Sequence, residues 1–276
     1  FDGGLKMAFA VDGIVTYEFG TDSLYLQEDG QTLTTDTMDT GTVQVNRSVY
    51  VPDDQGFARF LEGFTNTSDD TVEIEVNFFS NMGSDSETEI IGTSSGDTLL
   101  GQGDNWVSSD DSGYYEDGEY DPVVTHVFQD GSGVTADEST FDGYDEFDHF
   151  FTLTLAPGQT QYLLHFSAQD DFHVEALAKA DALSNLELGA LDGLSPTQQS
   201  QIVNWSLNRS IDGTEDTSLS LSEISIYDND AGTQSLSVSL SVASGSLDVS
   251  GGSGLYAIQG AGSDTLSFSG TPAQIN

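Results

Sequence analysis

Short runs of strand-forming residues recur through positions 1–170, and they constrain the fold of this chain more than any other feature. The runs are rich in Val, Ile, Thr, Tyr and Phe, and Gly, Asn and Asp turn signals separate them. One pair of runs, 43–51 and 57–64, flanks the turn sequence Pro-Asp-Asp-Gln-Gly and predicts a hairpin. Because no helical periodicity interrupts the series, positions 1–170 are predicted to form an antiparallel β-sandwich domain.

A helical pattern follows these strands. Apolar residues recur at three- and four-residue steps over about 172–188, which gives a helix one apolar face. They are Val174, Leu177, Ala178, Ala182 or Leu183, and Leu186. Further on, Ser195, Pro196 and Gln198 have the order of an N-cap, a first-turn proline and a capping-box glutamine. Positions 171–209 are therefore predicted to be a helical connector that packs on the first domain.

Positions 210–276 form a third part, in which apolar residues alternate with serine. Leu236, Val238, Leu240 and Val242 show this period of two, which predicts a strand with one apolar face. The segment is shorter than the roughly 100 residues of a complete Ig-like sandwich. It is therefore predicted to be the truncated N-terminal part of such a domain, and the chain to be a piece of a longer polypeptide.

The charge of the chain is strongly one-sided. The sequence holds 47 Asp and Glu against 5 Lys and Arg, a formal net charge of −42. Such a chain repels phosphate backbones and anionic lipid, which argues against nucleic-acid partners and against binding at a membrane surface. No apolar run is long enough to predict insertion into a membrane. The sequence has no cysteine, which excludes thiolate metal sites and cysteine nucleophiles.

Four acids in the third part are candidate metal ligands. Glu215 and Asp216 precede a run of alternating polar and apolar residues, and Asp228 and Asp230 follow it. Carboxylates gathered at the end of a sandwich repel one another unless a cation lies among them, and Ca²⁺ takes six to eight oxygen ligands. These four acids are therefore a candidate Ca²⁺ site. The alternative interpretation is that these are ordinary turn and cap acids.

The segment TEDTSLSLSEISIYDNDAGTQSLSVSLSVASGSLDV resembles the opening of the cadherin-like, Ig-like repeats that occur in tandem in large bacterial surface proteins and RTX-type adhesins. Glu215 and Asp216 match the family's EDT motif, and Asp228 and Asp230 match its D-x-D motif. The resemblance implies neighbouring repeats of the same chain as partners, Ca²⁺ at these acids, and a secreted or cell-surface bacterial protein. The sequences at 66–68, 81–85, 93–97, 104–106 and 121–128 resemble an uncharacterised β-domain that precedes such repeats.

A second candidate region is the acidic stretch 101–149. It contains 14 Asp and Glu, no Lys or Arg, and the four tyrosines Tyr114, Tyr115, Tyr120 and Tyr144. Tyrosine rings can stack on pyranose rings while carboxylates accept hydroxyl protons, so the stretch is compatible with a sugar-binding surface or a Ca²⁺ loop. The alternative is a set of long solvated loops at one end of the sandwich.

Catalytic signatures are weak. No nucleophile-elbow or H-E-x-x-H pattern accompanies the histidines His126, His149, His165 and His173. His149, His165 and His173 either form a metal site or are buried, hydrogen-bonded histidines, and the latter is the commoner case. Arg47 and Arg59 either clamp an anionic ligand or pair with nearby carboxylates, and their surroundings favour the pairing.

These patterns together predict a mainly β protein that is not an enzyme. The predicted role is a calcium-stiffened structural or adhesive module outside the cell, with a cell-surface glycan or protein as a possible partner. The alternative is a carbohydrate-binding or glycan-processing domain that acts through the acidic, tyrosine-rich loops.

Overall fold

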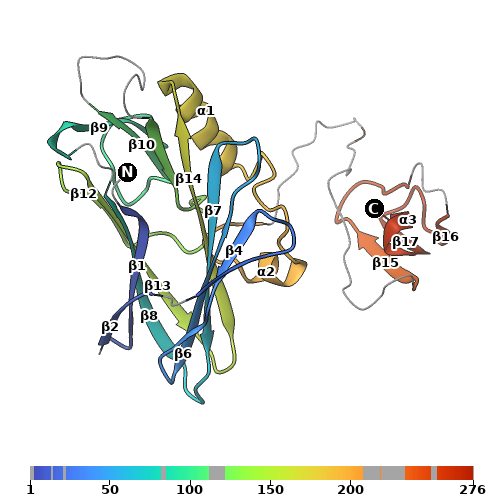
Figure 1. Ribbon diagram of the computed structural model, residues 1–276. Coiled ribbons are helices and arrows are strands. Elements are labelled where there is room, and N and C mark those ends of the chain that lie inside the picture. The colour runs from blue at the N-terminus through green and yellow to red at the C-terminus, as the bar shows by residue number, and fades with distance from the viewer. Residues whose placement is uncertain are drawn as a thin grey trace. The chain divides into compact units, whose positions relative to one another are not determined.

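The computed structural model describes residues 3–13, 15–20, 23–81, 85–111, 122–207, 218, 234–249 and 254–275 (Figure 1). The chain divides into two compact units, Phe1–Arg209 and Ser210–Asn276. The described part of the chain is built mainly from antiparallel strands, as the sequence predicts.

The first unit contains a five-stranded sheet of order β12-β13-β8-β1-β2. Its strands are β12 (Glu138–Phe141), β13 (Glu146–Leu155), β8 (Val72–Asn81), β1 (Gly3–Val11) and β2 (Val15–Glu18). All neighbours in this sheet pair antiparallel. The central pair, β8 and β13, is in register over ten residue pairs from Val72↔Leu155 to Asn81↔Glu146.

The second sheet of this unit has nine strands. Their order is β3 (Leu24–Leu26), β4 (Thr32–Thr35), β6 (Val43–Tyr50), β7 (Phe57–Asn66), β14 (Thr160–Asp170), β11 (Val123–Val127), β10 (Trp106–Asp111) and β9 (Thr88–Thr93), and β5 (Met38–Asp39) pairs with β6. A short 3-10 helix, η1 (Asp85–Glu87), precedes β9. The predicted hairpin is present as β6 and β7.

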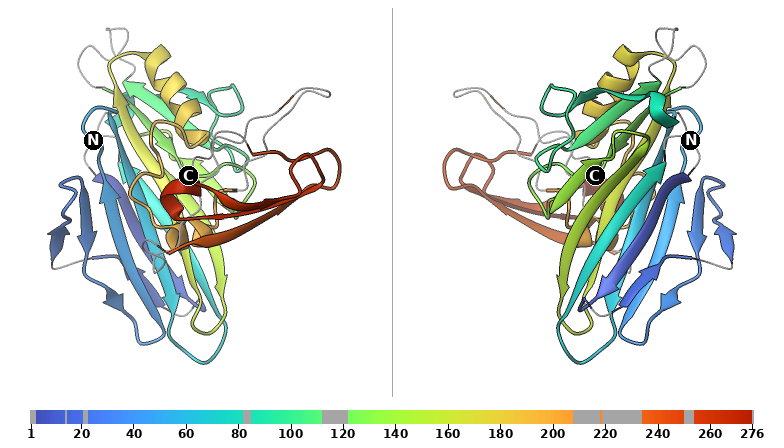
Figure 2. Two further views of the ribbon diagram at one scale, coloured as in Figure 1. Left: turned by 90° about the vertical axis from the view of Figure 1, so that its right-hand side faces the viewer. Right: turned by 90° about the vertical axis from the view of Figure 1, so that its left-hand side faces the viewer.

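The two sheets pack face to face around one apolar core, so the predicted β-sandwich is confirmed (Figures 1 and 2). On β8 and β13 buried and solvent-facing residues alternate, because successive side chains of a strand point to opposite faces. Phe9, Phe78 and Phe151 of the five-stranded sheet meet Phe64 of the other sheet in this core. Each buried phenylalanine contributes roughly 1.5–3 kcal/mol by leaving water.

Helices α1 (His173–Ser184) and α2 (Pro196–Gln201) pack against the nine-stranded sheet, and α1 and the residues that flank α2 form a second core with it. The capping box of α2 is present: Gln198 N donates to Ser195 Oγ at 3.2 Å, and Ser195 N donates to Gln198 Oε1 at 3.0 Å. The buried face of α1 is made by Ala176, Ala180 and Leu183. Val174, which the sequence places on that face, is 74% exposed, because it lies two residues before Ala176 and a step of about 200° puts it on the opposite side of the helix.

The described part of the second unit is a three-stranded antiparallel sheet of order β15-β17-β16, followed by a short helix. Its elements are β15 (Leu236–Ser241), β16 (Tyr256–Gln259), β17 (Thr265–Gly270) and α3 (Pro272–Ile275). The alternation expected from the sequence is present on β15, where the leucines and valine are less exposed than the serines. Leu240 and Val238 pair in register with Leu266 and Phe268, which are buried.

Candidate functional site

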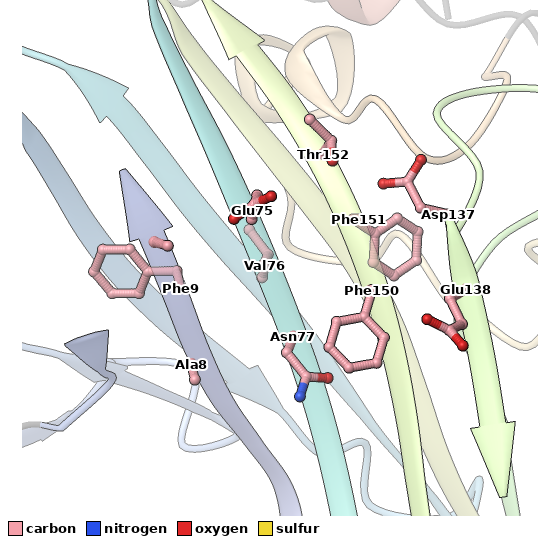
Figure 3. A pocket seen from close by; sticks show the side chains of 11 residues that line it. Ala8, Phe9, Glu75, Val76, Asn77, Asp137, Glu138, Phe150, Phe151 and Thr152 are labelled. Atoms are coloured by element: carbon pink, nitrogen blue, oxygen red, sulfur yellow. The ribbon is translucent and has the colours of Figure 1, made fainter. Parts of the chain in front are cut away.

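The outer face of the five-stranded sheet carries a row of unlike side chains. Glu138 on β12 pairs with Phe150 on β13, Phe150 pairs with Asn77 on β8, and Asn77 pairs with Ala8 on β1. Their side chains point away from the core, because the residues on either side of each in its strand are the more buried ones. An aromatic ring therefore lies between a carboxylate and an amide on an open surface (Figure 3).

The next row along the strands makes this surface hollow. Thr152 pairs with Glu75, and Glu75 pairs with Ala10. The side chains of Ala8 and Ala10 on β1 are small, whereas that of Phe150 on β13 extends further from the sheet. The result is an open groove of about 550 Å³. It is lined by Ala8, Phe9, Ala10, Glu75, Val76, Asn77, Asp137, Glu138, Phe150, Phe151 and Thr152.

Hydrogen bonds fix part of this groove and leave part of it open. Asn77 Nδ2 donates to Asp148 Oδ1 at 2.8 Å, which orients the amide. Asn77 Oδ1 is buried and has no hydrogen-bond partner among the described residues. The backbone N–H of Asp137 donates to the Phe150 carbonyl at 2.7 Å and holds the start of β12 beside the groove. A buried unpaired acceptor costs free energy, so this oxygen lowers the stability of the free protein slightly.

The groove can therefore hold a ring-shaped polar molecule. Phe150 is 36% exposed and offers an apolar platform. Glu75, Asp137 and Glu138 are exposed carboxylates that accept hydrogen bonds from hydroxyl or ammonium groups. Sites for small molecules typically combine such an apolar surface with a few polar groups that fix orientation.

A buried polar cluster occupies the interior of the same unit. Arg47 Nε donates to both carboxylate oxygens of Glu62, at 2.8 and 2.9 Å, and His165 Nε2 lies 3.0 Å from Glu62 Oε1. Glu62 is fully buried. Burial alone would raise its pKa, but Arg47 and His165 outweigh burial and hold the pKa of Glu62 below its ordinary value. The predicted pairing of Arg47 with a carboxylate is confirmed.

Arg59 behaves differently from the expectation. It is 2% exposed, and its Nη1 donates to the backbone carbonyls of Ala190 at 3.0 Å and Asp192 at 2.6 Å instead of to a carboxylate. Its guanidinium lies 4.5 Å from the centre of the Tyr50 ring. Burial lowers the pKa of Arg59 to about 10. Arg59 is thus a packing residue that ties the loop after α1 to the nine-stranded sheet.

His149, His165 and His173 do not come together as a metal site. His149 stacks on Phe128 and its Nδ1 lies 3.1 Å from Ser139 Oγ, whereas His173 pairs with Asp110 at 2.6 Å near the start of α1. Burial lowers the pKa of His126 to about 3. Within the residues that the structure describes, no three His, Asp or Glu side chains converge in a way that could hold a metal ion.

The four predicted Ca²⁺ ligands, Glu215, Asp216, Asp228 and Asp230, lie outside the described residues. Ca²⁺ at these positions stays a prediction, which thermal unfolding with Ca²⁺ and with Mg²⁺ would test. Of the four tyrosines in the acidic stretch 101–149, Tyr144 is described and is 48% exposed, and the other three are not among the described residues.

The sequence analysis missed most of the groove. Asp137 and Glu138 were included in the acidic stretch, but Glu75, Asn77 and Phe150 were not singled out. The alternation of β8 and β13 does place them on the outer face, and this signal was available. That they share one groove depends on the pairing of β12, β13, β8 and β1, which come from distant parts of the chain.

The first unit defines a class of protein: an antiparallel β-sandwich with a groove on the outer face of its smaller sheet. No family model matches the sequence, and no curated protein matches it. The chain is similar in fold to a polysaccharide lyase, with 14% identity, a TM-score of 0.42 and coverage of 64% of this chain and 27% of that one. It is also similar to a putative kojibiose phosphorylase from the human microbiome, with 12% identity, a TM-score of 0.46 and coverage of 67% and 26%. A putative aldose 1-epimerase from Klebsiella pneumoniae matches with 7% identity, a TM-score of 0.38 and coverage of 56% and 55%.

This chain spans about a quarter of the length of the lyase and of the phosphorylase. These similarities concern the fold, and they say nothing of an activity. None of the helices in the described part of the chain has the length and apolar character of a membrane-spanning helix.

These findings correct the expected family and role. The similar solved structures are carbohydrate-active enzymes, not cadherin-like adhesin repeats, and no family model of such a repeat matches. The prediction of a calcium-stiffened adhesive module is therefore wrong. The physical reason is that serine–leucine alternation with acidic turns is typical of any antiparallel sheet with one wet face, so the motif was not specific.

Proposed function

We propose that this chain binds a saccharide in the groove on the outer face of the five-stranded sheet. The single observation that carries the proposal is Phe150, whose open ring lies between Glu138 and Asn77 in one cross-strand row. A pyranose ring has apolar C–H faces and polar edges. Its face can pack on Phe150 while its hydroxyls reach the flanking carboxylate and amide.

One exposed aromatic residue is ordinary on a protein surface and needs no function. Two further observations set Phe150 apart. The floor beside it is lowered by Ala8 and Ala10, which leaves room for a ring. Asn77 Oδ1, in the same row, is a buried acceptor with no partner in the described part of the chain. A flat solvated surface would not account for the hollow.

Binding without chemistry fits this groove better than catalysis. Glycoside hydrolysis generally needs one carboxyl group that stays protonated, and enzymes usually achieve this by placing it in an apolar pocket. Glu75, Asp137 and Glu138 are all exposed to water instead. We therefore propose a binding domain and not a hydrolase.

Calorimetric titration with a panel of soluble oligosaccharides tests the proposal. Phe150→Ala should weaken the binding of whichever sugar binds by about tenfold, because an aromatic contact is worth on the order of 1 kcal/mol beyond the area it buries. Phe172→Ala removes an aromatic side chain that is also exposed, at 48%, on a different part of the unit, and it should leave affinity unchanged.

Tyr144→Ala separates the groove from the acidic loops. If Tyr144→Ala weakens binding and Phe150→Ala does not, the loops bind the sugar and the proposed site is wrong. If no sugar of the panel binds, the proposed function falls.

A further inference from the structure

We infer that the groove selects saccharides that carry ammonium groups over neutral ones and rejects saccharides that carry carboxylates. This inference rests on the proposed function and adds the substrate class to it. It follows from the arrangement of charge around Phe150.

The carboxylates stand on both sides of the stacking position. Glu138 is the direct cross-strand neighbour of Phe150 on β12. Glu75 lies on β8, on the other side of β13, opposite Thr152. Figure 3 shows Glu138 and Asp137 on one side of the phenylalanine pair and Glu75 on the other. A sugar ring on Phe150 therefore meets a carboxylate at each of two opposite edges.

Positive charge is scarce on this face. Lys6 is the one cation that the described residues place on it, and its ammonium lies 6.0 Å from the centre of the Phe79 ring, outside the groove lining. Arg47 and Arg59 belong to the nine-stranded sheet, and Lys179 pairs with Asp170 beside α1. Asp148 does have a neutral partner, the Asn77 amide. Glu75, Asp137 and Glu138 have no ion-pair partner within the described ranges.

The sign of the selectivity follows from Coulomb's law. An ammonium group on the bound sugar is attracted by these carboxylates, whereas a sugar carboxylate is repelled by them. Because the groove is open to water, each ammonium–carboxylate pair contributes little to binding. Two such pairs should raise the affinity for the ammonium sugar over a neutral one on the order of tenfold at low salt. The preference should shrink as salt is added.

The shape of the groove indicates an oligosaccharide. The row from Glu138 to Ala8 crosses four strands, β12, β13, β8 and β1. Neighbouring strands lie about 4.8 Å apart, so the row is roughly 14 Å long. That length exceeds one pyranose ring. A probe with several rings can therefore extend from Glu138 across β13 to β8, where Glu75 lies two residues from Asn77.

The test compares three soluble β-1,4-linked tetrasaccharides on the same glucose framework: glucosamine, glucose and glucuronate. Each is titrated into the full chain by calorimetry, below the pKa of the sugar amine, at low and at high salt. The glucosamine compound should bind about tenfold more tightly than the glucose compound at low salt, and the glucuronate compound more weakly than both.

A chain of net charge −42 attracts any cation, so a control of equal charge is needed. The double variant Glu75→Gln with Glu138→Gln removes two charges from the groove. Glu28→Gln with Glu187→Gln also removes two, both exposed and both on the side of the nine-stranded sheet. The groove variant should lose the preference for glucosamine, and the matched variant should keep it.

Three results would overturn the inference, and they differ in what they say of the proposed function. Equal affinities for glucosamine and glucose, or equal losses in the two double variants, would remove the charge selectivity and leave sugar binding intact. Binding of none of the three compounds, with none of the neutral panel either, would remove the proposed function as well.

Discussion

Phe150 on β13 lies directly opposite Asn77 on β8, although strands β9 to β12 separate them along the chain. This one pairing brings an aromatic platform beside a fixed amide whose Oδ1 has no partner among the described residues. Both strands belong to the most extensively paired region of the five-stranded sheet. The candidate site is therefore built on a rigid element, which favours a preformed binding surface.

Filling the groove should block binding without unfolding the protein. Ala8→Leu places a larger side chain beside Asn77 on a partly exposed strand position, where leucine is tolerated. Sugar affinity should fall by about tenfold or more, because the hollow is lost. Thr154→Leu is the matched control, since Thr154 faces out from β13 but does not line the groove. Equal affinity in the wild type and in Ala8→Leu would place the sugar elsewhere.

Removing the charge of Glu62 should strongly destabilise the first unit. Glu62→Gln leaves Arg47 with most of its side chain buried and without its carboxylate partner, and breaking a buried ion pair costs roughly 3–5 kcal/mol. Urea denaturation measures the change. Glu73→Gln, on an exposed position of β8, should change the free energy of unfolding by about 0.5 kcal/mol or less.

A second variant separates the ion pair from the packing around it. Adding Arg47→Met to Glu62→Gln should recover part of the lost stability, because the unpaired charge is then removed too. Additive losses in the double variant would contradict the pairing as the cause.

The protein should lose stability as pH falls from about 6.5 towards 3, and His126 should account for part of the loss. Burial lowers the pKa of His126 from its ordinary 6.5 to about 3. Between these values the unfolded chain binds a proton at this position and the folded chain does not, so stability rises with pH. At pH 5 the contribution lost is about 2 kcal/mol.

Two other buried histidines, His149 and His165, also have lowered pKa values and act in the same direction. The contribution of His126 is therefore measured by comparing the pH dependence of stability in the wild type and in a variant that lacks this histidine. Denaturation of the wild type and of His126→Leu at pH 7 and pH 5 should give a smaller pH effect in the variant. An identical pH effect in both proteins would show that His126 does not contribute.

The segment after α2 should be essential to the first unit. Asn204 is buried, accepts from Leu164 N at 2.9 Å, and donates to the carbonyls of Phe128 at 2.8 Å and Leu164 at 2.7 Å. Asn204→Ala should cost about 2–4 kcal/mol, because Leu164 N and Phe128 O lose their side-chain partner. Ser195→Ala, which removes only the exposed cap of α2, should cost about 1 kcal/mol. A loss for Asn204→Ala no larger than that for Ser195→Ala would contradict this role.

The assignment to adhesin repeats was wrong because its motifs are too short to be specific in an acidic chain. The acids Glu215, Asp216, Asp228 and Asp230 matched family motifs of two or three letters in a chain with 47 acidic residues. In such a composition, acids at any given spacing are common. The match therefore carried little information about the family, even though the strand pattern between those acids was readable.

The sequence by itself determined the local structure. Alternation set the faces of β8, β13 and β15, turn residues placed the β6–β7 hairpin, and Ser195, Pro196 and Gln198 set the start of α2. These features depend on neighbours a few residues away, so they can be read from a single chain.

Only the tertiary structure decided the site. The groove depends on strand order and register, which join β1, β8, β12 and β13 across long stretches of sequence. The partners of Glu62 and the burial of Arg59 likewise depend on the tertiary structure. They follow from the pairing of β7 with β6 and β14 and from the packing of the loop after α1 on the nine-stranded sheet. A period of two shows that a side chain faces away from the core. It does not show which residue of another strand will lie beside it, because strand pairing depends on packing over the whole sheet.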